Sequence, residues 1–187
     1  AANSCLYCVV AHGAILRIYE KKPLVADQVA VNYRKADISP RQKAMLDFAM
    51  TLCLRSHTVG EADFDALKAH GFSDEQLFGT YNAYADLRNA SGQFNEAGAY
   101  ADKAERIVLN QGFKKGTMPW IGTQNRKNIA LVGADKWSDA LANFDRVDEE
   151  KARIGNQSTA GVRPDLRAFV YLKTGRAEQA LSLLRAT

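Results

Sequence analysis

Apolar residues recur at spacings of three and four positions along almost the whole chain, which is the pattern of amphipathic helices. The alternation of apolar and polar residues that marks a strand is lacking, and so are the Asn-Gly turns that join strands into hairpins. The pattern therefore predicts an all-α protein in which each helix buries one apolar face.

Capping residues and prolines place the helices of the first part of the chain. Ser4 and Pro23 suit the starts of the first two helices, and Gly71 suits a left-handed end to the fourth. These signals predict helices over residues 4–21, 23–31, from 39 onward, 61–70 and from 73 onward. The third carries a continuous apolar stripe, which we expect to be core: Ala44, Met45, Phe48, Ala49, Leu52 and Cys53.

Beyond residue 78 the chain becomes repetitive. Three turn segments are each followed by a small residue at the same offset, at Ala97, Ala140 and Ala180, which are separated by 43 and 40 positions. Glycines and prolines mark loops at 112–122 and 155–164. The repeating unit is therefore a helical hairpin, and Tyr81 and Tyr84 fit the first helix of this array.

These hairpins over residues 79–187 resemble tetratricopeptide repeats of the longer, roughly forty-residue kind. The small alanines carry the likeness, with Phe144 and Leu184 at the large apolar position four residues on. Ala101, Arg88 and Lys127 depart from the family's pattern. The resemblance implies a concave surface that binds a peptide or protein partner.

Composition sets limits on the function. The chain has 187 residues, 47% of them apolar, and a net charge of +4 without a basic stripe interleaved with aromatics, which argues against nucleic-acid binding. No apolar run has the length of a membrane span, and the start does not resemble a signal peptide. Three cysteines do not form a secreted disulfide framework, so we expect a soluble protein of the reducing cytoplasm.

The sharpest chemical signal is a Cys-x-x-Cys-x-x-x-His motif formed by Cys5, Cys8 and His12. Positions three and four apart share one face of a helix, so the three side chains are expected to converge. A thiol in the first turn of a helix feels the positive end of the helix dipole, which lowers its pKa. Cys5 qualifies for such a shift, and Cys8 is the second candidate.

Three interpretations of this motif compete. The cysteines could be small core residues, or they could bind zinc, although neither His57 nor His70 brings another cysteine pair to complete a site. The third interpretation is redox catalysis, in which His12 moves a proton and one sulfur closes a disulfide on the other. We favour the third, which needs no metal or organic cofactor.

Several segments of residues 1–78 resemble the peroxidase-related branch of the alkyl hydroperoxidase D and carboxymuconolactone decarboxylase superfamily. They are Ala2–Ala14 with the motif, Ala26-Asp27-Gln28, Asn32-Tyr33-Arg34, Leu46–Ala49 and Gly71–Glu75. The resemblance implies that Cys8 attacks a peroxide, Cys5 resolves the product and His12 relays protons. It also implies a homo-oligomer, a helix before the motif that supplies a carboxylate, and a closing apolar helix. Neither helix is found, so we expect a partial bundle over residues 1–78.

We therefore predict a thiol-dependent peroxidase that reduces a hydroperoxide and is regenerated by an external dithiol or lipoyl-type reductant. The alternative is a non-catalytic helical scaffold whose repeats bind a protein partner. Ordinary pKa values near 8.5 for both Cys5 and Cys8 would favour the scaffold, and a lowered value would favour the enzyme. Decarboxylation of a lactone acid is disfavoured because it would leave the dithiol idle.

Overall fold

The computed structural model describes residues 5–159 and 163–186, and all regular structure in those residues is helical. This confirms the all-α prediction. The chain divides into two compact units, residues 1–73 and 74–187. None of the described helices is long and apolar enough to cross a bilayer.

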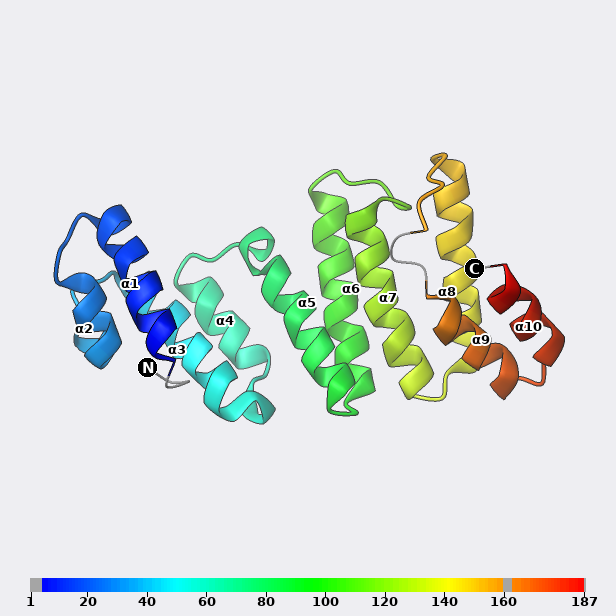
Figure 1. The fold of residues 1–187 in the computed structure, drawn as a ribbon, viewed down its shortest axis with the longest axis horizontal. Coiled ribbons are helices and arrows are strands. Elements are labelled where there is room, and N and C mark those ends of the chain that lie inside the picture. Colours follow the sequence, from blue (N-terminus) through cyan, green and yellow to red (C-terminus); the bar gives the residue numbers. More distant parts are fainter. Residues whose placement is uncertain (1–4, 160–162, 187) are drawn as a thin grey trace. The chain divides into compact units, whose positions relative to one another are not determined.

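The N-terminal unit contains four α-helices and two short 3₁₀ helices (Figure 1). They are α1 (Leu6–Glu20), α2 (Val25–Asn32), η1 (Tyr33–Lys35), α3 (Pro40–Arg55), η2 (Ser56–Thr58) and α4 (Glu61–Ala69). Packing within the unit joins α1 to α2 and α3 to α4. The candidate dithiol therefore lies in the α1–α2 pair.

Local capping chemistry explains most of these helix ends. Ser39 Oγ accepts the Gln42 N–H at 3.1 Å while Gln42 Oε1 accepts the Ser39 N–H at 2.8 Å, a reciprocal cap that starts α3 as predicted. Gly71 adopts φ +82° directly after α4, the left-handed end that the sequence indicates. The second helix differs from the prediction, because α2 begins at Val25 and Pro23 lies in the preceding turn.

The apolar stripe of α3 is not core, which corrects the prediction. No residue of α3 is buried, and Met45, Ala49 and Cys53 are exposed. Phe48 makes an edge-on contact with Phe64 of α4, with ring centroids 5.3 Å apart. Within this unit α3 packs against α4 and the two 3₁₀ turns, so only one side of its stripe is covered.

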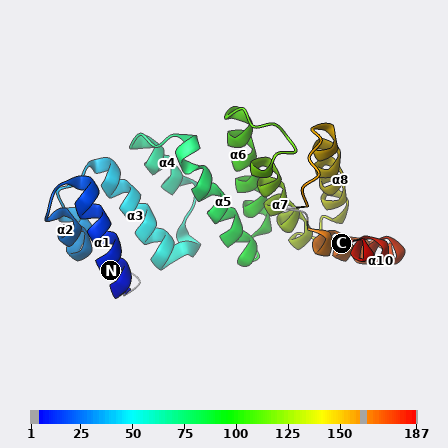
Figure 2. The ribbon, with the colours of Figure 1, turned by 45° about the horizontal axis from the view of Figure 1, so that its top comes forward.

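The C-terminal unit contains six α-helices in three hairpins (Figures 1 and 2). They are α5 (Asp74–Ala90), α6 (Phe94–Asn110), α7 (Met118–Gly133), α8 (Trp137–Arg153), α9 (Pro164–Lys173) and α10 (Ala177–Arg185). The turns between the two helices of each hairpin fall where the repeat pattern predicts them. The loop predicted at 112–122 is shorter, because Pro119 occupies the first turn of α7 and Gly122 lies inside that helix.

Small residues let the hairpins close. Ala97, Ala140 and Ala180, the repeated alanines, are all buried, at 0%, 0% and 2% exposure. Of the two large residues predicted beside them, Phe144 is buried and Leu184 is 51% exposed, because α10 packs chiefly on α9. The helical hairpins are therefore present, whereas membership of the tetratricopeptide class stays a prediction.

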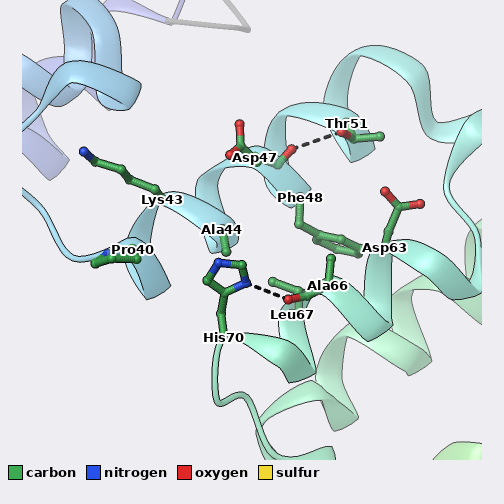
Figure 3. Close-up of a pocket in the computed structure, with 10 residues that line it drawn as sticks. All are labelled: Pro40, Lys43, Ala44, Asp47, Phe48, Thr51, Asp63, Ala66, Leu67 and His70. Atoms are coloured by element: carbon green, nitrogen blue, oxygen red, sulfur yellow. Dashed lines mark hydrogen bonds between the residues drawn. The ribbon is translucent and has the colours of Figure 1, made fainter.

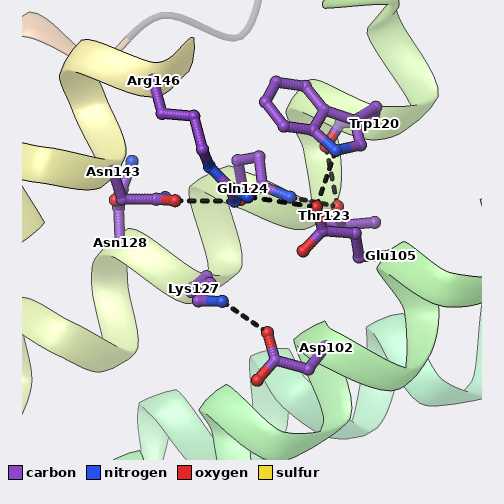
Figure 4. A network of polar contacts seen from close by, with 9 residues as sticks. All are labelled: Asp102, Glu105, Trp120, Thr123, Gln124, Lys127, Asn128, Asn143 and Arg146. Carbon is purple, nitrogen blue, oxygen red and sulfur yellow. Dashed lines mark hydrogen bonds and ion pairs between the residues drawn. The ribbon is translucent and has the colours of Figure 1, made fainter. Parts of the chain in front are cut away.

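Aromatic and polar contacts add specificity to the C-terminal unit. Tyr84 packs edge-on against Tyr100 of α6, with ring centroids 4.5 Å apart, as expected for the first helix of the array. A polar network then joins α6, α7 and α8 around four buried side chains (Figure 4): Thr123, Gln124, Asn128 and Asn143. Asn143 Nδ2 donates to Asn128 Oδ1 at 2.8 Å across α7 and α8, whereas Asn128 Nδ2 is buried without a hydrogen-bond partner.

Gly116, in the turn before α7, offers a direct test of this packing. It has φ +83°, and a Cβ added to it would lie 2.4 Å from the backbone oxygen of Glu150. Gly112 has a similar φ of +85° with open space around it. We expect Gly112→Ala to lower the free energy of unfolding by about 1 kcal/mol, from the left-handed backbone alone. Gly116→Ala should lower it by about 3 kcal/mol, because steric overlap is added.

Urea denaturation of the two variants and the native protein measures this difference. Equal losses for Gly112→Ala and Gly116→Ala would show that the turn before α7 does not pack against α8 as described.

Candidate functional site

The dithiol lies at the opening of α1. Cys5 is the residue that caps this helix, with extended backbone angles (φ −86°, ψ 98°), and its Sγ accepts the backbone N–H of Cys8 at 3.2 Å. A thiol thus takes the place usually held by a serine or aspartate oxygen. The predicted cap, Ser4, lies outside the described residues.

The hydrogen bonds between Cys5 and Cys8 shift the pKa values of the two thiols in opposite directions. The Cys8 thiol donates to the Cys5 sulfur, and this contact together with the Cys8 N–H lowers the pKa of Cys5 below its ordinary value. Because the Cys8 thiol is the donor of this hydrogen bond, the pKa of Cys8 is raised. Partial desolvation of the Cys8 sulfur and the negative charge on Cys5 add to the rise. When the pair loses its first proton, the negative charge is therefore favoured on Cys5 and the remaining proton on Cys8. The expectation of a lowered pKa is met by Cys5 and is wrong for Cys8.

Cys8 and His12 line one hollow between α1 and α2, with a volume of about 220 Å³. Both side chains are exposed. They lie one turn apart on the same face of α1, as their spacing predicts. Cys5 is half-buried and does not line the hollow. The structure thus places the three predicted residues next to one another along α1. Cys5 contacts Cys8, and Cys8 and His12 line the same hollow. All three cysteines of the chain are free thiols.

The opposite wall of the hollow comes from α2, which the motif did not reveal. Its residues are Ala26, Val29 and Ala30. The two helices approach closely at Gly13, where an added Cβ would lie 3.9 Å from the Ala26 Cβ. An ion pair between Arg17 and Asp27, 2.7 Å long, holds them together further along. The only sequence signal for this wall is the run of small and branched residues in α2.

A second hollow, about 330 Å³, lies between α3 and α4 (Figure 3). Phe48 and Leu67 contribute its apolar lining, and His70 donates from Nδ1 to the Ala66 carbonyl at 2.8 Å. Asp47 accepts hydrogen bonds from Tyr33 at 2.7 Å and from Arg34 at 2.8 Å, and neither donor lines the hollow. These contacts, the tyrosine's first, lower the pKa of Asp47. This hollow contains no sulfur and none of the predicted catalytic residues.

Metal chemistry has no support in the described part of the chain. No group of three or more histidine, cysteine, aspartate or glutamate side chains there is arranged to hold a metal ion.

Comparison with known proteins gives one partial match. No protein-family model matches the chain, and no curated protein matches it. Among solved structures, the chain is similar to a peroxidase-related protein from Ralstonia eutropha JMP134, an alkylhydroperoxidase AhpD core, with 77% identity and a TM-score of 0.40. The match covers 41% of this chain and 40% of that protein.

The charge separation in the dithiol predicts two distinct labelling profiles. Alkylation of Cys5 by iodoacetamide should reach half its maximal rate at a lower pH than that of an ordinary thiol, and alkylation of Cys8 should do so at a higher pH. In Cys8→Ala the midpoint for Cys5 should rise, because the donating thiol is lost, yet stay below the ordinary value because the backbone N–H remains.

Mass spectrometry of the labelled peptides follows both sulfurs in one sample. Coincident profiles for Cys5 and Cys8, or a Cys5 profile that does not respond to Cys8→Ala, would contradict the hydrogen-bonded arrangement.

Proposed function

We propose that this protein is a thiol-dependent peroxidase that reduces hydroperoxides at Cys8. The observation that carries the proposal is the shared wall of Cys8 and His12 in the α1–α2 hollow, with the Cys5 sulfur bonded to the Cys8 N–H. A hydroperoxide in this hollow meets the Cys8 sulfur and the His12 imidazole, and the Cys5 sulfur lies behind Cys8. The Ralstonia protein is described as peroxidase-related, in agreement with this reading.

The first step oxidises Cys8. His12 takes the Cys8 proton, and the sulfur attacks the terminal oxygen of the hydroperoxide, which breaks the O–O bond. Cys8 becomes a sulfenic acid, and the departing alkoxide takes the proton from His12 to leave as an alcohol. Because the pKa of Cys8 is raised, this proton transfer is essential to the attack.

The second step uses the charge on Cys5. Its anionic sulfur attacks the Cys8 sulfur, forms the disulfide and releases hydroxide, which takes a proton from solvent to become water. The lowered pKa of Cys5 favours the anionic form of this resolving sulfur over that of an ordinary thiol. An external dithiol, such as a reduced lipoyl group, then returns both sulfurs to thiols and is itself oxidised to a disulfide.

The lowered pKa of Cys5 supports this function over that of a purely structural dithiol. Two ordinary thiols would have favoured the scaffold interpretation, whereas the pKa of Cys5 is lowered by contacts with Cys8. Binding of a protein partner by the hairpins of residues 79–187 and assembly into a homo-oligomer stay predictions.

The test is consumption of a hydroperoxide with dithiothreitol as the reductant. We expect Cys8→Ser to reduce turnover at least about a thousandfold, because it removes the nucleophile. With no reductant present, Cys5→Ser should complete one turnover and accumulate the sulfenic acid on Cys8, because resolution is lost. His12→Gln should slow the first step about a hundredfold.

Cys53→Ser is the matched control, since Cys53 is an exposed thiol on α3, outside the hollow. It should turn over like the native protein. Native-like turnover by Cys8→Ser would rule out the proposed peroxidase site.

A further inference from the structure

The hollow between α3 and α4 combines an apolar lining with polar groups at its two ends (Figure 3). Phe48 and Leu67 are the largest apolar side chains that line it, and Ala44 and Ala66 leave room between them. Its volume of about 330 Å³ falls in the range of small-molecule sites, about 300–1,000 Å³. Both helices belong to the N-terminal unit, so this hollow is complete within that unit.

Two polar side chains of the lining give their protons to backbone carbonyls. The Thr51 hydroxyl donates to the carbonyl oxygen of Asp47 at 3.0 Å, and His70 Nδ1 donates to that of Ala66 at 2.8 Å. A carbonyl oxygen can only accept, so these bonds fix where the two hydrogens lie. The Thr51 oxygen and, in the neutral imidazole, the His70 Nε2 atom are therefore acceptors for a ligand.

Two carboxylates add further acceptors, and their charges are balanced differently. Asp47 forms an ion pair with Arg34 at 2.8 Å. Asp63 uses its Oδ2 atom to accept the Gly60 N–H at 2.9 Å, and among the described residues no cation forms an ion pair with it. Because Asp63 is half-buried, solvent screens its charge less than that of an exposed carboxylate. The Asp63 Oδ1 atom is thus a charged acceptor at the hollow.

The charges of the lining lie toward opposite ends of the hollow. Thr51 and Asp63 lie near the connection between α3 and α4, whereas Lys43 lies in the first turn of α3 and His70 directly after α4. Lys43 is the one lysine or arginine among the described residues of the lining. Its ammonium group extends away from Phe48 and Asp63 (Figure 3). The end at Asp63 is therefore rich in acceptors and lacks a cation.

We propose that the α3–α4 hollow binds a compact organic amine in its ammonium form. The ammonium group donates to Asp63 Oδ1 and, at the same end, to the Thr51 oxygen, while the apolar body lies against Phe48 and Leu67. An ammonium group has three donors and no acceptor, which complements this end of the lining. A carboxylate there would place its oxygens against the same acceptors. This site takes no part in the dithiol chemistry and goes beyond the proposed peroxidase function.

Two ligands of nearly equal shape test the role of the charge. Benzylamine is an ammonium ion at about pH 7, and benzyl alcohol is neutral. We expect benzylamine to bind at least about tenfold more tightly, because its hydrogen bonds to Asp63 join two opposite charges. Titration followed by proton–nitrogen correlation NMR measures both Kd values, and the largest shifts should occur at the amides of Thr51, Asp63 and Leu67.

Two pairs of variants locate the site. Asp63→Asn keeps an oxygen for the Gly60 N–H but removes the charge, so it should weaken benzylamine about tenfold and leave benzyl alcohol unchanged. Asp65→Asn makes the same change at an exposed position of α4 outside the hollow, and it should alter Kd by less than about twofold. Ala44→Leu fills the hollow and should weaken both ligands, whereas Ala49→Leu, exposed on α3 outside it, should not. Circular dichroism verifies that each variant keeps its helices.

Several results would overturn the proposal. Equal affinities for benzylamine and benzyl alcohol, or equal losses in Asp63→Asn and Asp65→Asn, would show that the Asp63 charge does not hold the ligand. Absence of benzylamine binding would overturn it as well. If Ala44→Leu then dissociates a dimer in sedimentation velocity, the hollow is instead a contact between two copies of the chain.

Discussion

One hydrogen bond, from the backbone N–H of Cys8 to the sulfur of Cys5, organises the candidate site. It starts α1, because the thiol of Cys5 satisfies an N–H group that the first turn of a helix leaves without a partner. Together with the hydrogen bond from the Cys8 thiol, which has the larger effect, it stabilises the Cys5 sulfur as an anion. The Cys8 thiol keeps its proton because it donates to Cys5. Helix initiation and the charge on the dithiol therefore share this contact.

The candidate site also requires a neighbouring helix, because the hollow beside Cys8 is lined by both α1 and α2. α2 supplies one wall of the hollow at Cys8 and His12. Two helices thus form the hollow, with the sulfur and the imidazole on α1 and an apolar boundary on α2. Ala26 belongs both to this boundary and to the buried core of the N-terminal unit.

The features that were predictable from sequence are those set by local chemistry. Ser39 and Gln42 cap one another within a single turn, and the left-handed Gly71 ends α4 through its own backbone. The repeated alanines at 97, 140 and 180 marked the hairpin contacts because only a small side chain fits there. Each of these depends on residues close together in the chain or on a repeated pattern.

Features that depend on which helix packs against a given helix face could not be predicted from the sequence. The stripe from Ala44 to Cys53 indicated an apolar face, but an apolar pattern does not say whether a neighbour covers it. The α2 wall at Ala30 was missed for the same reason. The motif placed both thiols in the first turn, where they looked alike, and only the geometry of the Cys8 N–H decides which sulfur accepts it.

The central claim is that Cys5 and Cys8 form one redox couple across the opening of α1. Peptide mass spectrometry of the reduced protein after treatment with one equivalent of tert-butyl hydroperoxide tests this most directly. The account predicts an intramolecular Cys5–Cys8 disulfide with Cys53 left as a thiol. A product in which Cys5 and Cys8 both remain reduced, or in which Cys53 is the oxidised residue, would contradict it.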